Sequence, residues 1–200
     1  MQKKGYNVLL FDQRSHGESE GTYIGMGWLE KDDVLDWIDF VITKDSDANI
    51  ILHGTSMGGA TVMMVSGETL PENVKGIVED CGYTSVWDMF ANELDYLYGL
   101  PTFPVLNAAQ LVGEIRAGYN FKEASSVESV KKATVPMLFI HGGADNYVVT
   151  DMVYDVYEAC PTTKELLIVV GAGHAQSHYI DPELYYSTVF TFIEKNCISN

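Results

Sequence analysis

A single serine lies between two glycines in the pentapeptide G-T-S-M-G at residues 54–58, directly after the apolar run Ile50–His53. A G-x-S-x-G pattern can place its serine at the apex of a sharp strand-to-helix turn, where the hydroxyl is exposed for nucleophilic attack. We expect glycine to be required at both Gly54 and Gly58, because a side chain at either position would collide with the neighbouring backbone. The pattern also occurs in ordinary loops, so its meaning depends on the residues elsewhere in the chain.

A serine hydroxyl is a weak nucleophile and needs a base that is held in place by an acid. Two glycine-bearing loops supply one of each, because Asp145 follows the apolar run Met137–His141 and His174 follows the run Glu165–Val170. In an α/β sheet, loops at the carboxyl ends of different strands meet at one edge. The sequence therefore predicts a catalytic triad with Ser56 as nucleophile, Asp145 as acid and His174 as base.

Two other residues compete for these roles. His178 lies four residues beyond His174 and is the alternative base, and Asp80 ends the apolar run Val74–Asp80 and is the alternative acid. From the end of that run, a carboxylate could also reach the histidine.

The remaining histidines and acids are interpreted as structural. His53 and His141 end buried runs and are expected to have satisfied hydrogen bonds, whereas Asp151 fits the first turn of a helix. No pair of these residues has the spacing of metal ligands on a helix or hairpin, so no metal site is predicted. No nucleotide or other cofactor is expected either.

The elements that must position these residues alternate between strand and helix. The runs that predict strands are mostly uninterrupted aliphatic sequences, which is typical of parallel strands covered on both faces. The runs are Asn7–Phe11, Ile50–His53, Val74–Asp80, Met137–His141 and Glu165–Val170. The sequence therefore predicts a single domain over residues 1–200, with a doubly wound, mostly parallel α/β sheet of about five strands.

Apolar stripes at helical spacing separate these runs. Asp181 followed by Pro182 predicts a capped helix start, and Pro161 is expected to end the preceding helix. The three clearest stripes are Val34, Trp37, Ile38 and Val41; Met152, Val153, Val156, Tyr157 and Cys160; and Tyr185, Val189 and Phe192.

Residues 83–130 contain no strand pattern but carry short helical patterns with many large apolar residues. Such an insertion usually covers the carboxyl edge of the sheet, so we predict a helical lid, with extra core helices as the alternative. Trp87, Phe90, Tyr96 and Phe103 are the predicted substrate-binding residues of this lid.

The bulk composition limits the function classes. A formal net charge of -16 argues against nucleic acid and anionic membrane surfaces as partners. Cys81, Cys160 and Cys197 are widely spaced and predict neither a disulfide framework nor a zinc site. No run approaches the ~20 apolar residues of a membrane span. We therefore expect a cytoplasmic location for the chain as given, and an extracellular or membrane-anchored one if a longer N-terminus exists.

The stretch G-Y-N-V-L-L-F-D-Q-R-S-H-G-E-S-E-G at residues 5–21 gives a more specific indication, together with residues 53–60, 80–83, 141–145 and 171–174. In these motifs the chain resembles the α/β-hydrolase fold, and within it the serine-aminopeptidase-like group of bacterial esterases and peptidases. The resemblance covers essentially the whole chain. It implies a serine hydrolase that cleaves a carboxylic ester, or else a peptide or amide, through an acyl-enzyme. It also implies that the backbone N–H of Met57 is one oxyanion donor. The aromatic residues of the predicted lid and the acidic composition indicate a small neutral or apolar substrate.

The chain departs from that family at its start. In the family, three more strands and a helix precede this stretch, and a loop among them supplies the second oxyanion donor. Met1–Gly5 here matches the basic last turn of a helix with its glycine cap, directly before the run Asn7–Phe11. The second function hypothesis is accordingly a weakly active or inactive hydrolase-like binding protein that lacks half of the oxyanion hole.

Without those strands, three arrangements are open. Either Asn7–Phe11 pairs directly with Ile50–His53, or another chain fills the gap, or the 200 residues are a fragment of a longer protein. Because an exposed strand edge with apolar side chains invites self-association, we expect a dimer or larger assembly through the amino-terminal strand region.

Overall fold

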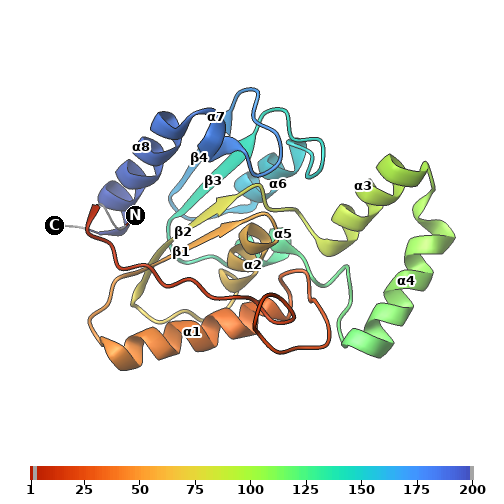
Figure 1. Cartoon of the computed structure of the whole chain (residues 1–200), viewed down its shortest axis with the longest axis horizontal. Helices are drawn as coiled ribbons and strands as arrows, with labels where there is room; N and C mark the ends of the chain where they lie inside the picture. The colour runs from red at the N-terminus through yellow and green to blue at the C-terminus, as the bar shows by residue number, and fades with distance from the viewer. Residues whose placement is uncertain (2–3, 199–200) are drawn as a thin grey trace.

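The centre of the molecule is a sheet of four parallel strands in the order β1-β2-β3-β4 (Figure 1). The structure is a computed structural model that describes Met1 and residues 4–198, so the helix end predicted at Met1–Gly5 lies partly outside the described residues. The strands are β1 (Ile50–Thr55), β2 (Val74–Asp80), β3 (Met137–Gly142) and β4 (Lys164–Val169).

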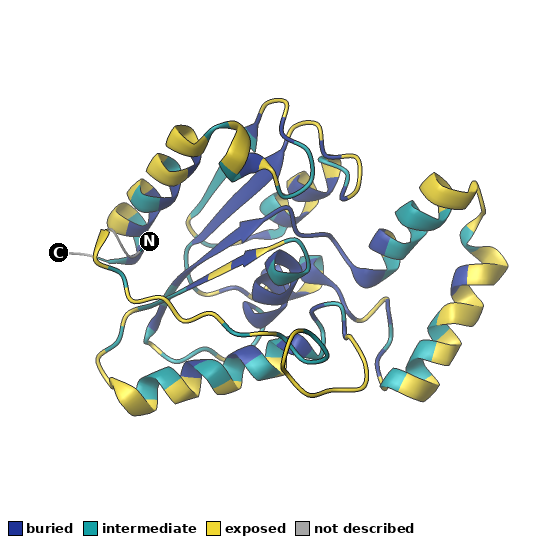
Figure 2. Cartoon of the chain, in the orientation of Figure 1, coloured by how far each residue is buried: buried dark blue, intermediate teal, exposed yellow. Residues whose placement is uncertain are grey.

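Helices cover both faces of this sheet, as the sequence predicts (Figure 1). Alternate strand residues point to opposite faces. Thus Ile77 and Phe139 pack with the helices of one face, and Val78 and Leu138 pack with those of the other. The first face carries α1 (Glu30–Lys44), α2 (Met57–Val65) and α6 (Asp151–Ala159), and the second carries α7 (Ser177–Ile180), α8 (Pro182–Phe192) and the short π-helix η2 (Ile193–Cys197). Figure 2 shows that β2 and β3 are buried between these two layers, whereas β1 and β4 are partly exposed.

The helix ends follow the signals in the sequence. The side chain of Asp181 accepts a hydrogen bond from the backbone N–H of Leu184 at 2.9 Å, with Pro182 in the first turn of α8. Asp151 lies in the first turn of α6, where its negative charge interacts favourably with the positive end of the helix dipole. The stripe predicted on α8 is buried, and so is that on α6 except for Tyr157, which is partly buried. Among the described helices, none combines the length and the apolar character needed to cross a lipid bilayer.

The predicted strand Asn7–Phe11 is wrong, and the sheet has four strands rather than about five. Side chains hold this segment instead of a ladder, because Phe11 stacks on Trp37 with ring centroids 5.4 Å apart and Tyr6 stacks on Phe190 at 5.8 Å. A cleft of about 680 Å³ lies between the segment, α1 and β1. The direct pairing with Ile50–His53 is therefore absent, because the cleft separates the two segments. Across this gap their backbone groups cannot form the hydrogen bonds of a ladder.

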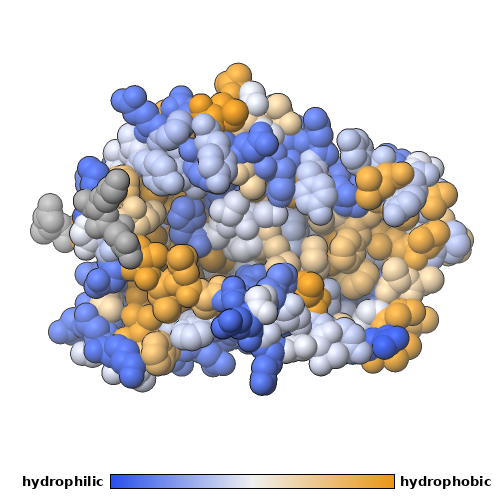
Figure 3. All heavy atoms as spheres, viewed as in Figure 1, coloured by the Kyte–Doolittle hydropathy of each residue, from blue (hydrophilic) through white to orange (hydrophobic). Residues whose placement is uncertain are grey.

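This arrangement leaves an open sheet edge beside an exposed apolar segment. Among the described residues β1 pairs only with β2, so its other edge faces the cleft. Val8, Leu9 and Leu10 are 40%, 47% and 88% exposed. Figure 3 shows an apolar patch on the surface where this segment crosses the molecule.

The insertion at residues 83–130 forms three helices, namely α3 (Val86–Tyr98), α4 (Thr102–Ala117) and α5 (Ser126–Val130). α3 and α4 extend away from the sheet as an antiparallel pair (Figure 1). An isolated bridge between Ser85 and Ser125 closes the base of the insertion. Near this base Val86 and Met89 are buried in a second core cluster, whereas the outer parts of both helices are exposed (Figure 2).

We expect the open edge and the exposed segment to bring two copies of the chain together. Replacing Leu10 by lysine adds a charge to this patch without removing packing, so it should weaken association. Light scattering at micromolar concentration should give a mass above the monomer for the wild type and a lower mass for Leu10→Lys. Ile115→Lys is the control, because Ile115 is 75% exposed on α4, away from the patch. A wild type that stays monomeric over this range would contradict the expectation.

Candidate active site

The turn at Ser56 joins β1 directly to α2. Ser56 has φ 57° and ψ -120°, a conformation that costs a non-glycine residue about 1–3 kcal/mol. Two backbone hydrogen bonds hold it there, because the N–H of Ser56 donates to the carbonyl of Asp80 at 2.8 Å and its own carbonyl accepts from Ala60 at 3.0 Å. The hydrogen bond to the sheet on one side and the one to the helix on the other therefore keep Ser56 in this strained conformation.

The two glycines of the turn have different roles. A Cβ atom at Gly54 would lie 2.0 Å from the carbonyl oxygen of Gly58, so only glycine fits there. A Cβ atom at Gly58 would meet nothing within 4 Å. The expectation that both positions require glycine is thus correct for Gly54 and wrong for Gly58, because the start of α2 packs back onto Gly54 while Gly58 faces open space.

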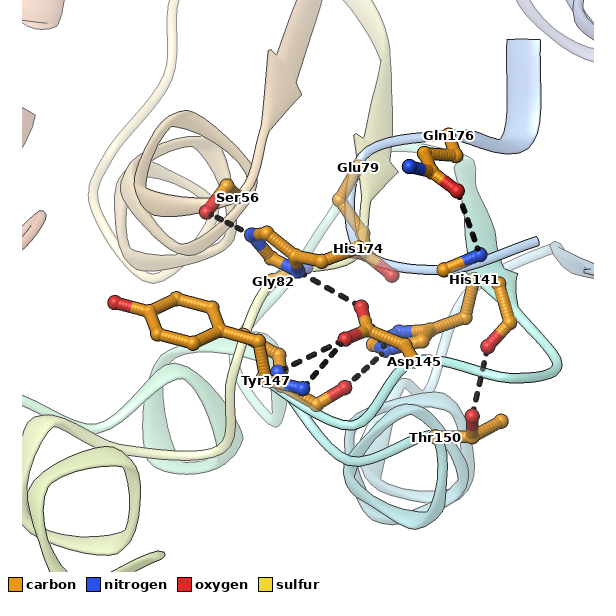
Figure 4. Close-up of polar contacts among 12 residues, drawn as sticks. Ser56, Glu79, Gly82, His141, Asp145, Tyr147, Thr150, His174 and Gln176 are labelled. Atoms are coloured by element: carbon orange, nitrogen blue, oxygen red, sulfur yellow. Dashed lines mark hydrogen bonds and ion pairs between the residues drawn. The ribbon is translucent and has the colours of Figure 1, made fainter. Parts of the chain in front are cut away.

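The three residues of the predicted triad lie in one line of hydrogen bonds (Figure 4). The Oγ atom of Ser56 is 2.7 Å from Nε2 of His174, and Nδ1 of His174 is 2.8 Å from Oδ2 of Asp145. Because an ionised carboxylate only accepts, Nδ1 carries the hydrogen and Nε2 is free to accept the serine proton. This geometry can perform base-assisted attack by the serine.

Asp145 is buried and held by several donors. Its Oδ1 accepts hydrogen bonds from the backbone N–H groups of Tyr147 and Val148, each at 3.0 Å. Burial raises the pKa of the Asp145 carboxyl, but hydrogen bonds from His141 and His174 lower it more, so its pKa lies well below the usual value. The carboxylate is therefore ionised at neutral pH.

The alternative acid does not reach the histidine. Asp80 is buried at the end of β2, and neither of its carboxylate oxygens has a hydrogen-bond partner among the described residues. Burial raises its pKa, which disfavours a standing negative charge at this position.

The alternative base packs elsewhere. The ring of His178 lies 3.9 Å from that of Tyr179 and 5.8 Å from that of Tyr185, measured between centroids. Nε2 of His53 lies 3.0 Å from the hydroxyl of the same Tyr185, as expected for a structural histidine with a partner. His178 and His53 therefore belong to a polar group around Tyr185.

Two residues that the sequence analysis did not select contact the triad. The ring of Tyr147 lies 4.9 Å from that of His174 in an edge-on arrangement. The sulfur of Cys81 is fully buried, and it lies with ligand atoms of Asp145 and His174 in a group whose members are all within 4.8 Å of one another. Cys81 directly follows β2, and Tyr147 lies two residues after Asp145. These positions were the signals in the sequence that could have indicated both residues.

The group of Cys81, Asp145 and His174 is the one place among the described residues where three such atoms could hold a metal ion. Burial raises the pKa of the Cys81 thiol, so the thiolate that a metal requires is disfavoured. A metal would also have to compete with the hydrogen bond between His174 and Asp145. The contacts therefore favour proton transfer over metal binding at this site.

The predicted lid residues lie in different surroundings. Trp87 borders a surface cleft, with the ammonium nitrogen of Lys122 4.2 Å from its ring centroid. Phe90 packs on Phe121 with ring centroids 5.1 Å apart, whereas Tyr96 and Phe103 are 67% and 74% exposed. Their role in substrate binding stays a prediction.

Comparisons with known proteins agree with this architecture. Residues 1–104 match the family described as alpha/beta hydrolase fold. The chain is 31% identical over 191 residues to the uncharacterized protein YqkD of Bacillus subtilis, a match that covers 95% of this chain. It spans 63% of that relative, which is less than two thirds of its length.

Solved structures give the same result for the fold. The Pyrococcus furiosus esterase Pf2001 superimposes with a TM-score of 0.74 at 24% identity, over 98% of this chain and 73% of the esterase. An acylaminoacyl peptidase of Pyrococcus horikoshii superimposes with a TM-score of 0.64 at 18% identity, over 88% of this chain and 29% of the peptidase. At these identities the likeness establishes the fold alone.

The contrast between the two glycines gives a direct test of the turn. Gly54→Ala should lower the free energy of unfolding by at least about 1–3 kcal/mol, because the backbone of α2 must move. Gly58→Ala should stay within about 1 kcal/mol of the wild type, since alanine suits a helix better than glycine. Urea unfolding of both variants measures the difference, and equal stabilities would contradict the described packing of Gly54.

Proposed function

The chain belongs to the α/β-hydrolase family, and from this premise we propose that it is a serine hydrolase that cleaves a carboxylic ester through an acyl-enzyme. The observation that carries the proposal is the line of hydrogen bonds from Ser56 through His174 to Asp145, at 2.7 and 2.8 Å. Serine, imidazole and carboxylate in this order are the groups that activate a hydroxyl for attack on a carbonyl.

In the proposed reaction, Nε2 of His174 takes the proton from Ser56 as Oγ attacks the ester carbonyl. Asp145 keeps Nδ1 protonated and stabilises the imidazolium that forms. The backbone N–H of Met57, the first residue of α2, would donate to the oxyanion. His174 then gives its proton to the leaving alcohol, and a water molecule activated by the same histidine releases the acyl group.

We further propose a small neutral or apolar acyl or aryl ester as substrate. The exposed faces of α3 and α4 carry large apolar side chains, among them Tyr96, Tyr98 and Phe103. The chain has a formal net charge of -16, which repels anions at low ionic strength. Of the predicted lid residues, Tyr96 and Phe103 are exposed and free to contact such a group, whereas Phe90 packs against the second core cluster.

Peptide or amide cleavage is the nearest alternative, because the same triad chemistry serves both bonds and an acylaminoacyl peptidase shares the fold. A weakly active binding protein is the second alternative. A fluorophosphonate that labels Ser56 without measurable ester or peptide turnover would favour this second alternative.

Substitutions should distinguish the residues of the proposed triad from nearby residues by their effect on turnover. Ser56→Ala should abolish p-nitrophenyl ester turnover and fluorophosphonate labelling while circular dichroism stays unchanged, since the position is a turn apex. Asp145→Asn should lower kcat by roughly 10³–10⁴-fold, because the histidine takes the wrong tautomer.

Asp80→Asn is the matched control for that second substitution. Asp80 is a buried carboxylate at the same edge of the sheet that makes no hydrogen bond to His174. Its replacement should therefore lower kcat by less than about tenfold. Equal turnover in the wild type and Ser56→Ala would refute the proposal, and a larger loss in Asp80→Asn than in Asp145→Asn would move the acid to Asp80.

The substrate preference can be measured with two esters of similar size. The kcat/KM of p-nitrophenyl butyrate should exceed that of the anionic p-nitrophenyl hemisuccinate by about tenfold or more at low salt, because the acidic protein repels the second carboxylate. Added salt should reduce this ratio if the cause is electrostatic. A preference for the anionic ester would contradict the proposal.

A further inference from the structure

A second histidine contacts the proposed acid of the triad. His141 lies near the carboxyl end of β3 and is fully buried. Its Nε2 atom is 2.9 Å from the carbonyl oxygen of Val148 and 3.4 Å from Oδ2 of Asp145. Figure 4 shows the Asp145 carboxylate between the rings of His141 and His174.

The carbonyl of Val148 determines which ring nitrogen carries a hydrogen. A carbonyl oxygen only accepts, so Nε2 of His141 must be the donor in this bond. The same nitrogen lies 3.4 Å from Oδ2 of Asp145, the oxygen that also binds His174, so the partially positive edge of the ring lies beside this carboxylate oxygen. Oδ1 is held by two backbone N–H groups.

A buried carboxyl group on the neighbouring strand lies close enough to His141 to influence its charge. Glu79 on β2 is fully buried, its Oε2 accepts from the N–H of Gly82 at 3.0 Å, and its Oε1 has no hydrogen-bond partner among the described residues. Nδ1 of His141 likewise has none.

These groups influence one another's protonation. Burial lowers the pKa of His141, but the hydrogen bonds to Asp145 and Val148 and the charge of Glu79 together raise it above the usual value. Burial raises the pKa of Glu79 to about 8. The titratable groups around this histidine are Glu79 and Asp80 from β2, Asp145 from the loop after β3, and His174 beyond it.

We propose that His141 is a positioning residue: the Val148 carbonyl fixes its Nε2–H, and the positive edge of the ring, 3.4 Å from Oδ2 of Asp145, keeps this carboxylate at the place and in the ionised state in which it orients His174. This inference rests on the proposed triad and adds one residue to it. The order along the site becomes Glu79, His141, Asp145, His174 and Ser56, in which acids and bases alternate up to the nucleophile.

Two substitutions separate the positioning role from a merely structural one. His141→Met removes the donor at similar volume, whereas His141→Gln keeps an amide N–H that can reach the Val148 carbonyl. With p-nitrophenyl butyrate, His141→Met should lower kcat per titrated active site by roughly 10–100-fold and leave KM within about twofold, because the displaced carboxylate no longer aligns His174. His141→Gln should recover most of this loss.

The pH profile provides a readout that lost packing alone would not move. His141→Met removes a group that lowers the pKa of the Asp145 carboxyl, so the acid limb of kcat should move upward in this variant. Phe139→Leu is the control, because Phe139 is buried on the same strand and the same face but lies outside the triad contacts. It should reduce stability without changing kcat per active site or the pH profile.

A spectroscopic measurement tests the contact without any activity. In protein labelled with ¹⁵N-histidine, Nε2 of His141 should be protonated at every pH at which the protein is folded and neutral or more acidic. The resonance is assigned by its loss in His141→Gln. An unprotonated Nε2 would overturn the proposal even if His141→Met failed to fold.

The outcomes also distinguish this proposal from the proposed function. If Ser56→Ala abolishes turnover but His141→Met keeps full kcat per active site, then the hydrolase assignment stands and the positioning role is wrong. If the wild type has no turnover that depends on Ser56, the hydrolase assignment fails, and the protonation of Nε2 alone then decides whether His141 holds Asp145.

Discussion

The backbone hydrogen bonds of the parallel sheet continue past the ends of its strands, and the position of every proposed functional group depends on this continuation. The N–H of Ser56 still donates to Asp80, and that of Cys81 still donates to Ile140, each at 2.8 Å. Gly143 donates in the same way to Val169, also at 2.8 Å. The loops that carry the serine and the acid are thus anchored in register with the sheet, rather than attached to it as free connections. Hydrogen bonds between donors and acceptors fixed by the sheet are what allow the 2.7 and 2.8 Å contacts of the triad to form.

The same edge concentrates the unfavourable features of the chain. Ser56 and Cys81 have positive φ values of 57° and 50°, and each such conformation costs about 1–3 kcal/mol. Glu79 and Asp80 place adjacent carboxyl groups in the interior with incomplete hydrogen bonding. Burying polar groups in this way is destabilising, so the apolar clusters on both faces of the sheet must offset it. The distribution is typical of a functional edge on a scaffold that is otherwise well packed.

Much of the arrangement could be predicted from the sequence, because the signals were local. Aliphatic runs identified β1 to β4, Asp181 identified the start of α8, and the order of serine, aspartate and histidine identified the residues that the structure brings together. The errors concern relations that a sequence does not contain. The apolar run Asn7–Phe11 has the composition of a strand, but a cleft of about 680 Å³ separates it from β1, and it pairs with no strand among the described residues.

Contacts across loops escaped the sequence analysis for a similar reason. His141 was expected to have satisfied hydrogen bonds, and its Nε2 does bond to the Val148 carbonyl, but its Nδ1 has no partner among the described residues and its Nε2 also lies near Asp145. His141 and Asp145 are four residues apart, a spacing that brings side chains together on a helix. Here His141 lies in β3 and Asp145 in the turn after it, and the path of this turn brings Nε2 of His141 to 3.4 Å from Oδ2 of Asp145. The expectation for Gly58 was wrong because the need for glycine depends on the atoms beside it, which the sequence does not show.

β1 has two features that bear on the site. Ser56 follows its last residue, and among the described residues it is paired on one side only. The strand that positions the proposed nucleophile is therefore also the strand whose other edge borders the cleft beside residues 5–11.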